Sequence, residues 1–187
     1  MKKDDIRRKV RAVKSLLSQE DKAQAARSVF GRLEELAAFM LSDRILLYHS
    51  LPDELSTREF IDKWCDKKSF FLPRVNGVGL DILPYDRSTL RLGAFQIEEP
   101  QGDDTTSIDE IEMVIVPAVA YDRCGNRVGR GKGYYDRLMK DSRALKVGVG
   151  YDFQFFDEIE SEEHDVPVDI VITESNTYII RNNSPKR

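Results

Sequence analysis

The stretch MVIVPAVAY, residues 113 to 121, decides the fold class of this 187-residue chain. It is apolar and rich in β-branched residues, as is typical of a strand covered on both faces by helices. The segment RVGRGKGYYDRL, residues 127 to 138, follows it and mixes glycines, basic residues and tyrosines before a helical pattern begins. We therefore predict a central strand over 113–121 and a functional loop beyond its carboxyl end, where open α/β sheets bind ligands.

Two amphipathic helices are predicted before Ser42, because apolar residues there recur three and four positions apart. These residues are Ile6, Val10, Val13 and Leu17 in the first helix, and Val29, Leu33, Leu36 and Met40 in the second. A short strand-like run over 44–50 comes next. The chain thus begins with helices and then enters a sheet.

The next helix is predicted to start near Thr57, since Ser56 and Glu59 have the spacing of a capping box. Its inward-facing residues are expected to be Phe60, Ile61 and Trp64. Two strands, over 69–75 and 80–85, then flank the turn-prone sequence NGVG.

Downstream of the central strand, a helix over 134–141 alternates with strands over 146–151, 169–173 and 178–181. Strands alternating with helices predict an α/β fold, with a three-layer αβα arrangement and a central sheet that is mostly parallel or mixed. We expect a single domain over 1–187, with a surface excursion over 91–107 and a frayed tail over 182–187.

The composition is that of an ordinary soluble globular protein, with 33% charged and 41% hydrophobic residues and a net charge of −4. A mildly acidic protein lacks the field of a general nucleic-acid binder, so the basic loop must act locally. The chain shows neither a secretory signal nor a stretch of membrane-spanning length. Cys65 and Cys124 form no disulfide framework or zinc spacing, and we expect a cytoplasmic protein.

The glycine-rich loop matches neither of the two common phosphate fingerprints. A Walker A loop needs four residues between its first glycine and its Gly-Lys pair, followed by Ser or Thr. Here five residues separate Gly125 from Gly131, and Gly133 follows Lys132. A dinucleotide fingerprint needs a third glycine where Tyr134 stands.

The loop still has the physical features of an anion site. Glycines let backbone N–H groups approach an anion, and a helix beginning near Tyr134 would turn its positive end toward it. Arg127, Arg130 and Lys132 concentrate positive charge there and would repel one another with nothing negative bound. The alternative is a solvated, mobile basic turn.

Carboxylates near this loop are candidates for binding the Mg²⁺ that accompanies a polyphosphate. Asp136 lies just inside the predicted helix, where the helix dipole also favours a carboxylate. A second ligand would come from a neighbouring strand end, where Asp165 and Asp169 flank the sequence VPV. A solvated turn is the alternative for these two residues.

The same residues carry a resemblance to a known family. IVPAVAYDRCGNRVGRGKGYYDRL, KVGVGYDFQ and EEHDVPVDIVITE resemble segments of the 5-formyltetrahydrofolate cyclo-ligases, also called 5,10-methenyltetrahydrofolate synthetases. KKDDIR near the amino terminus, YHSLPDELST and FQIEEP extend the resemblance over nearly the whole chain. The R-x-G-x-G-K-G-Y-Y-D segment is its most specific part.

The resemblance implies an enzyme that uses ATP and Mg²⁺ to convert 5-formyltetrahydrofolate into 5,10-methenyltetrahydrofolate, releasing ADP and phosphate. In the implied mechanism the formyl oxygen attacks the γ-phosphate to give an N5 iminium phosphate. N10 then attacks that carbon, and phosphate leaves as the ring closes. The substrate is a small molecule, and no nucleic acid, membrane or obligate protein partner is expected.

The resemblance also implies roles for matching residues. The catalytic residues would be Arg130, Lys132 and Tyr134. ATP would be held by Lys3, Arg7, Arg127, Gly129, Arg130, Gly131, Lys132, Gly133, Tyr134 and Tyr135. The folate would contact Leu51, Glu54, Ser56, Arg130, Gly131, Lys132, Gly133 and Tyr134, and Mg²⁺ would be bound by Asp136 and Asp165.

One position departs from the family pattern, which usually has Asp or Glu where this chain has Ser56. A serine can cap a helix but offers no carboxylate to a folate. Glu54, two residues earlier, is the candidate to replace it, and a surface charge is the alternative for Glu54.

Two other functions fit parts of the sequence. A non-catalytic module could bind RNA or a free nucleotide through the basic loop and its tyrosines, although the net negative charge argues against it. A kinase acting on another small acid would use a similar loop.

Overall fold

The computed structural model describes residues 1–92 and 98–180, so the predicted tail at 182–187 lies outside the described residues. The helices are α1 (Lys3–Lys14), α2 (Gln19–Glu34), α3 (Ala37–Leu41), α4 (Arg58–Trp64) and α5 (Tyr134–Met139), with short 3₁₀ helices at Ile108–Glu110 and Asp152–Gln154. Within these ranges, no helix combines the length and the apolar character needed to cross a membrane.

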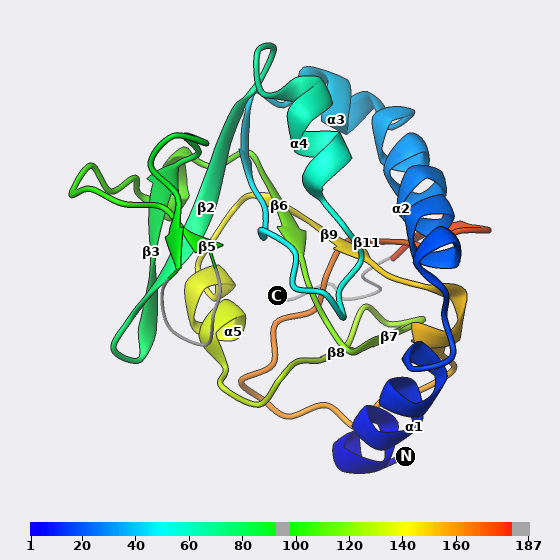
Figure 1. Cartoon of the computed structure of the whole chain (residues 1–187). Coiled ribbons are helices and arrows are strands. Elements are labelled where there is room, and N and C mark those ends of the chain that lie inside the picture. Colours follow the sequence, from blue (N-terminus) through cyan, green and yellow to red (C-terminus); the bar gives the residue numbers. More distant parts are fainter. Residues whose placement is uncertain (93–97, 181–187) are drawn as a thin grey trace.

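A seven-stranded sheet occupies the centre of the molecule (Figure 1). In spatial order its strands are β12 (Thr177–Ile179), β11 (Ile170–Ile172), β9 (Leu145–Val149), β6 (Met113–Val116), β1 (Arg44–Leu46), β2 (Ser69–Asn76) and β3 (Gly79–Pro84). The five inner strands are parallel, and the edge strands β12 and β3 are antiparallel to their neighbours. The predicted α/β fold with a mostly parallel sheet is confirmed, and β6 is the middle strand.

Both faces of β6 are buried, because alternate side chains of a strand point to opposite faces of its sheet. On one face, Met113 and Ile115 belong to a core that includes α2, α3 and α4. On the other face, Val114 and Val116 join a core with Tyr121 and with Met139 of α5. The sheet is therefore the middle of three layers, and the second outer layer combines α5 with extended segments.

The predicted strand 113–121 is divided in the structure. β6 ends at Val116, because Pro117 has no N–H to continue the ladder. The chain then forms a second, three-stranded sheet from β10 (Phe155–Phe156), β7 (Ala120–Asp122) and β8 (Arg127–Val128). The basic loop, residues 127–135, therefore begins in β8 rather than directly after the central strand.

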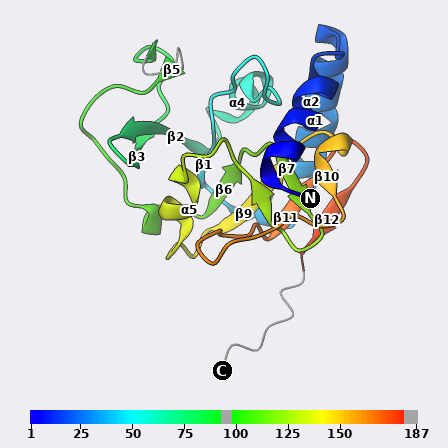
Figure 2. The same cartoon turned by 90° about the horizontal axis from the view of Figure 1, so that it is seen from below.

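Helix α1 packs on this small sheet rather than on the central one. Ile6 and Val10 of α1 are buried with Ala120, Val128 and Ile159. Figure 2 shows α1 beside β7 and β10. The first turns of the chain are thereby held next to the basic loop that leaves β8.

Tyr121 attaches the small sheet to the central one. Its ring is fully buried, and its hydroxyl donates to the carbonyl of Val116 and accepts from the N–H of Val149 at 3.3 Å. A Cβ atom at Gly148 of β9 would lie 2.8 Å from Tyr121 Cζ and closer still to Cε1. Position 148 therefore requires glycine, because the ring lies directly on the backbone of β9.

The prediction that Leu36 and Met40 continue the second helix is wrong. α2 ends at Glu34, and α3 begins only at Ala37. Leu36 is extended, with ψ of 127°, so the helical face is rotated and Met40 is 57% exposed.

The predicted capping box of Ser56 and Glu59 does not form. Thr57 is the residue that precedes α4, and its hydroxyl donates to the carbonyl of Tyr48 at 2.9 Å instead of capping the helix. The Ser56 hydroxyl accepts a long hydrogen bond of 3.4 Å from the N–H of Arg58.

A Gly148→Ala substitution should lower the free energy of unfolding by about 1–3 kcal/mol, because the added methyl group overlaps the Tyr121 ring. Chemical denaturation measures this change. Gly31→Ala is the control, since a methyl group at that position of α2 would have no neighbouring atom within 4 Å; it should raise stability by about 0.5–1 kcal/mol. Unchanged stability in the Gly148→Ala protein would contradict the packing argument.

Candidate functional site

A cleft of about 2130 Å³ opens beyond the carboxyl end of β6, where Pro117, Ala118 and Val119 line it. With two exceptions, Ser56 and Asp169, the site residues predicted from the sequence line this cleft. They are Lys3, Arg7, Leu51, Glu54, Arg127, Gly129, Arg130, Gly131, Lys132, Gly133, Tyr134, Tyr135, Asp136 and Asp165. The fold thus brings together segments from the first helix, the loop after β1, the basic loop and the loop before β11.

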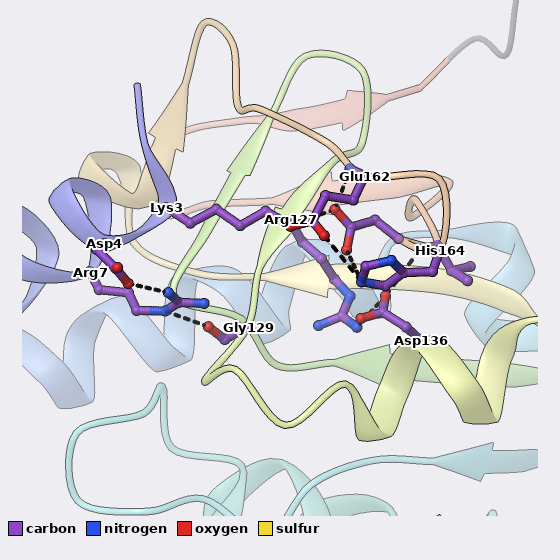
Figure 3. Close-up of polar contacts among 10 residues, drawn as sticks. Lys3, Asp4, Arg7, Arg127, Gly129, Asp136, Glu162 and His164 are labelled. Carbon is purple, nitrogen blue, oxygen red and sulfur yellow. Dashed lines mark hydrogen bonds and ion pairs between the residues drawn. The ribbon is translucent and has the colours of Figure 1, made fainter.

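Helix α1 contributes Lys3 and Arg7, which are four residues apart and share one face of the helix. Arg7 Nε donates to the carbonyl of Gly129 at 3.0 Å, and its Nη1 donates to Asp4 at 2.6 Å. Lys3 extends away from the helix toward Glu162, as Figure 3 shows. The helix therefore contacts the basic loop and the acidic segment before β11.

The Lys3 ammonium lies 2.6 Å from Asp165 Oδ2 and 3.1 Å from Glu162 Oε1. Partial burial alone would lower the pKa of Lys3, but hydrogen bonds to these two carboxylates raise it above the ordinary value. Burial alone would raise the pKa of Asp165, but the hydrogen bonds from Lys3 and from the N–H of Glu162 lower it. Lys3 is thus positively charged and Asp165 negatively charged at neutral pH.

Arg127 forms the buried part of the basic loop. Its side chain is 5% exposed, and Nη2 lies 2.8 Å from Asp136 Oδ1 (Figure 3). Its guanidinium lies over the ring of Tyr135, with 5.9 Å between Cζ and the ring centroid. Within the part of the chain that the structure describes, Arg127 Nε is the buried side-chain nitrogen without a hydrogen-bond partner. An unpaired donor in the cleft wall indicates a place for an acceptor such as a phosphate oxygen.

Asp136 and Asp165 have the chemistry of the one or two protein carboxylates that typically bind Mg²⁺. The N–H of Val166, which follows Asp165, donates to Asp136 Oδ1 at 3.0 Å. The start of α5, which carries Asp136, therefore lies next to the loop that carries Asp165. Asp136 Oδ2 and Asp165 Oδ1 each accept no hydrogen bond from the described residues. Mg²⁺ typically takes one or two carboxylates and fills its other positions with phosphate oxygens and water.

Over residues 1–92 and 98–180, no group of three or more His, Cys, Asp or Glu side chains is arranged to hold a metal ion. A metal at Asp136 and Asp165 would therefore depend on ligands brought by a bound phosphate. Asp169, the alternative second ligand, does not line the cleft. Its Oδ2 accepts from the N–H of Lys146 at 2.8 Å, which gives it a structural role beside β9.

Arg130 spans from the basic loop to the loop after β1. Its Nη2 lies 2.8 and 3.0 Å from the two carboxylate oxygens of Asp53 and 3.3 Å from Glu54 Oε1. Partial burial alone would raise the pKa of Asp53, but the hydrogen bond from Arg130 lowers it. Asp53 was not among the predicted site residues, and its only signal in the sequence is its place beside Glu54.

The remaining loop residues differ in backbone conformation and in burial. Gly131 and Gly133 have φ of 96° and 67°, a backbone conformation that favours glycine. Lys132 is exposed, while burial raises the pKa of the Tyr135 hydroxyl at the base of the loop. Helix α5 has only six residues, so an anion at this loop would be bound mainly by backbone N–H groups and cationic side chains.

Apolar side chains form part of the cleft wall as well. They belong to Tyr48, Leu51, Leu72, Pro73, Val75 and Leu80. His49 and Glu98 add a polar pair there, with 3.0 Å between His49 Nδ1 and Glu98 Oε2, and burial lowers the pKa of His49. A cleft lined by both cations and apolar side chains can hold a polyphosphate beside a flat organic ring.

Like Asp169, Ser56 is a predicted site residue that the structure does not bring to the cleft. Glu54 does line it, with a side chain only 16% exposed. Its Oε2 accepts from the N–H of Leu51 at 2.9 Å. The carboxylate available to a ligand near Leu51 is therefore that of Glu54 rather than any group at position 56.

Comparison with known proteins gives the same family over nearly the whole chain. Residues 1–174 match the 5-formyltetrahydrofolate cyclo-ligase family. A 5-formyltetrahydrofolate cyclo-ligase of Haemophilus influenzae is 29% identical over 182 residues, covering 91% of this chain and 97% of the relative. The protein of that name from Escherichia coli K12 is also 29% identical, over 183 residues, covering 92% and 98%.

Solved structures agree. A 5,10-methenyltetrahydrofolate synthetase of Aquifex aeolicus has a TM-score of 0.89 and 33% sequence identity, covering all of this chain and 97% of that one. A 5,10-methenyltetrahydrofolate synthetase of Mycoplasma pneumoniae, at 22% identity, has a TM-score of 0.74 and covers 93% of this chain and 99% of that one. The second likeness supports the fold alone.

An Asp165→Asn substitution should flatten the acid side of the stability profile. In the folded protein the pKa of Asp165 lies below its ordinary value of 3.8. The stability that this carboxylate contributes is therefore complete above pH 3.8 and is lost as the pH falls through the lower folded value. Urea denaturation from about pH 5 to pH 2 would measure the slope. Lys3→Met should flatten it too, and identical slopes in all three proteins would contradict the pairing.

Proposed function

This chain belongs to the 5-formyltetrahydrofolate cyclo-ligase family, whose members are ligases, and we propose that it uses Mg·ATP to convert 5-formyltetrahydrofolate into 5,10-methenyltetrahydrofolate, ADP and phosphate. The observation that carries this proposal is the junction of a cationic, glycine-rich loop with an apolar pocket in one cleft. The loop suits the phosphates of ATP, and the apolar side chains of the cleft wall suit the pterin ring of the folate.

The proposed reaction has two steps. The formyl oxygen attacks the γ-phosphorus, the bond to the bridging oxygen breaks, and ADP leaves with the electron pair. N10 then attacks the activated formyl carbon and loses its proton, and the C–O bond breaks to release phosphate. Phosphorylation thus turns a poor leaving oxygen into a good one.

The residues of this chain would act by positioning and by neutralising charge, which carry most of the catalysis of phosphoryl transfer. Lys3 and Arg7 would hold the nucleotide from α1, and the loop Arg127–Tyr135 would surround its phosphates. Arg130, Lys132 and Tyr134 would lie where the transferred group meets the folate. The unpaired Nε of Arg127 supports this placement, because it is a buried donor in need of an acceptor.

Asp136 and Asp165 would hold Mg²⁺, which when bound supplies charge neutralisation at the phosphate oxygens. Lys3 and Arg127 now pair with these two carboxylates. When ATP and the metal bind, Lys3 and Arg127 would release the two carboxylates or share them with the metal. Leu51 and Glu54 would contact the folate, with Glu54 as the carboxylate that Ser56 does not provide.

Purified protein should hydrolyse ATP only when 5-formyltetrahydrofolate and Mg²⁺ are both present, and a new near-ultraviolet absorption band should mark the methenyl product. Phosphate release and absorbance would be followed together. ATP turnover with other small acids and without the new band would favour a kinase. Salt-sensitive binding to single-stranded RNA without any turnover would favour the non-catalytic module.

Lys132→Ala should lower turnover by about 100-fold or more, as expected for a cation that stabilises the transferred phosphoryl group. Stability should change by no more than about 0.5 kcal/mol, because the side chain is exposed. Steady-state kinetics and thermal denaturation measure the two effects. Arg143→Ala, at an exposed cation that does not line the cleft, is the control and should change neither. Equal losses of stability and activity in Lys132→Ala would assign the loop a structural role.

A further inference from the structure

The contact between Arg130 and Asp53 joins two walls of the cleft that are distant in the sequence. Asp53 lies in the loop after β1, and Arg130 lies in the basic loop after β8. Both oxygens of Asp53 lie within 3.0 Å of Arg130 Nη2. Nothing in the proposed reaction yet gives Asp53 a role.

Asp53 is held in place independently of Arg130. Its carbonyl oxygen accepts from Lys14 Nζ at 2.7 Å, which ties the loop to α1. The neighbouring Glu54 is fixed by the N–H of Leu51 and adds a third oxygen, 3.3 Å from Arg130 Nη2. Arg130 therefore approaches a preformed acidic corner, and the corner determines where the guanidinium lies.

The Arg130–Asp53 ion pair is too exposed to contribute much to the free energy of folding. The side chains of Arg130 and Asp53 are 52% and 56% exposed. Ion pairs of this kind contribute about 0–1 kcal/mol to folding, because solvent screens the attraction and the side chains lose rotamer freedom. The contact therefore points to orientation rather than to holding the fold together.

The geometry leaves most of the guanidinium available. Only Nη2 of Arg130 contacts the acidic corner. Nε and Nη1 carry three of the five N–H groups of an arginine, and they make no hydrogen bond within residues 1–92 and 98–180. Nε and Nη1 point in different directions, because the paired donor edges of a guanidinium are Nε with Nη2 and Nη1 with Nη2. Arg130 can thus bind a phosphate through one of these free nitrogens, Nη1 or Nε, without releasing Asp53.

Resting on the proposed function, we propose that Asp53 is a positioning residue for Arg130. It holds the guanidinium across the cleft so that a free nitrogen, Nη1 or Nε, meets the phosphoryl group during transfer. Because a misplaced charge acts mainly in the transition state, loss of Asp53 lowers kcat more than it raises the KM for ATP.

Asp53→Asn should lower kcat by about 10- to 100-fold, a usual cost of a misplaced catalytic group. The KM for ATP and the melting temperature should stay close to those of the wild type. Asp53→Glu, which restores the charge, should recover part of the loss. Asp157→Asn is the matched control, because it breaks an exposed pair with Arg123 outside the cleft and should leave kcat unchanged.

A double-mutant cycle separates positioning from an independent effect. In an Arg130→Ala background, followed under single-turnover conditions, Asp53→Asn should cause no further loss. An equal loss in both backgrounds, an unchanged kcat in Asp53→Asn, or a change in KM alone would overturn the inference while leaving the proposed function intact. A wild-type protein without folate-dependent ATP turnover would overturn both.

Discussion

The packing of the Tyr121 ring on the bare backbone of Gly148 is the constraint on which the site depends. It fixes β7 of the small sheet against β9 of the central one, with the Tyr121 hydroxyl donating to the last residue of β6. The basic loop leaves this small sheet, and α1 packs on it through Ile6 and Val10. One close contact therefore sets where both sources of positive charge stand relative to the carboxyl end of the central strand.

The electrostatics of the cleft follow from that arrangement. Lys3, Arg127 and Arg130 each pair with a carboxylate from another segment, namely Asp165, Asp136 and Asp53. A protein with a net charge of −4 can thus keep a local cluster of cations without strong mutual repulsion. The same carboxylates can serve a bound nucleotide, either as metal ligands or as groups that orient an arginine.

Much of the fold could be predicted because periodicity and burial are local properties of the sequence. Residues 113–116 were correctly placed at the centre of a mostly parallel sheet, but the predicted strand 113–121 divides at Pro117, and 120–121 belong to the small sheet. Met40 was predicted on the apolar face of the second helix because its spacing continues that of Leu33 and Leu36, while the backbone break at Leu36 rotates it to the surface. For the site, the motif at 127–136 identified the loop, and the cleft now brings Lys3, Arg7 and Asp165 to it; their roles remain predictions.

The sequence by itself determined the fold class, the family and the cationic loop, because each is written in a continuous stretch of residues. Only the tertiary structure decided that Glu54 rather than Ser56 faces the cleft, that Asp169 supports β9 instead of the site, and that Asp53 holds Arg130. These contacts join residues as far apart as 77 positions. Spacing along the chain cannot reveal them, since they exist only once β1, β8 and α1 are packed around the same cleft.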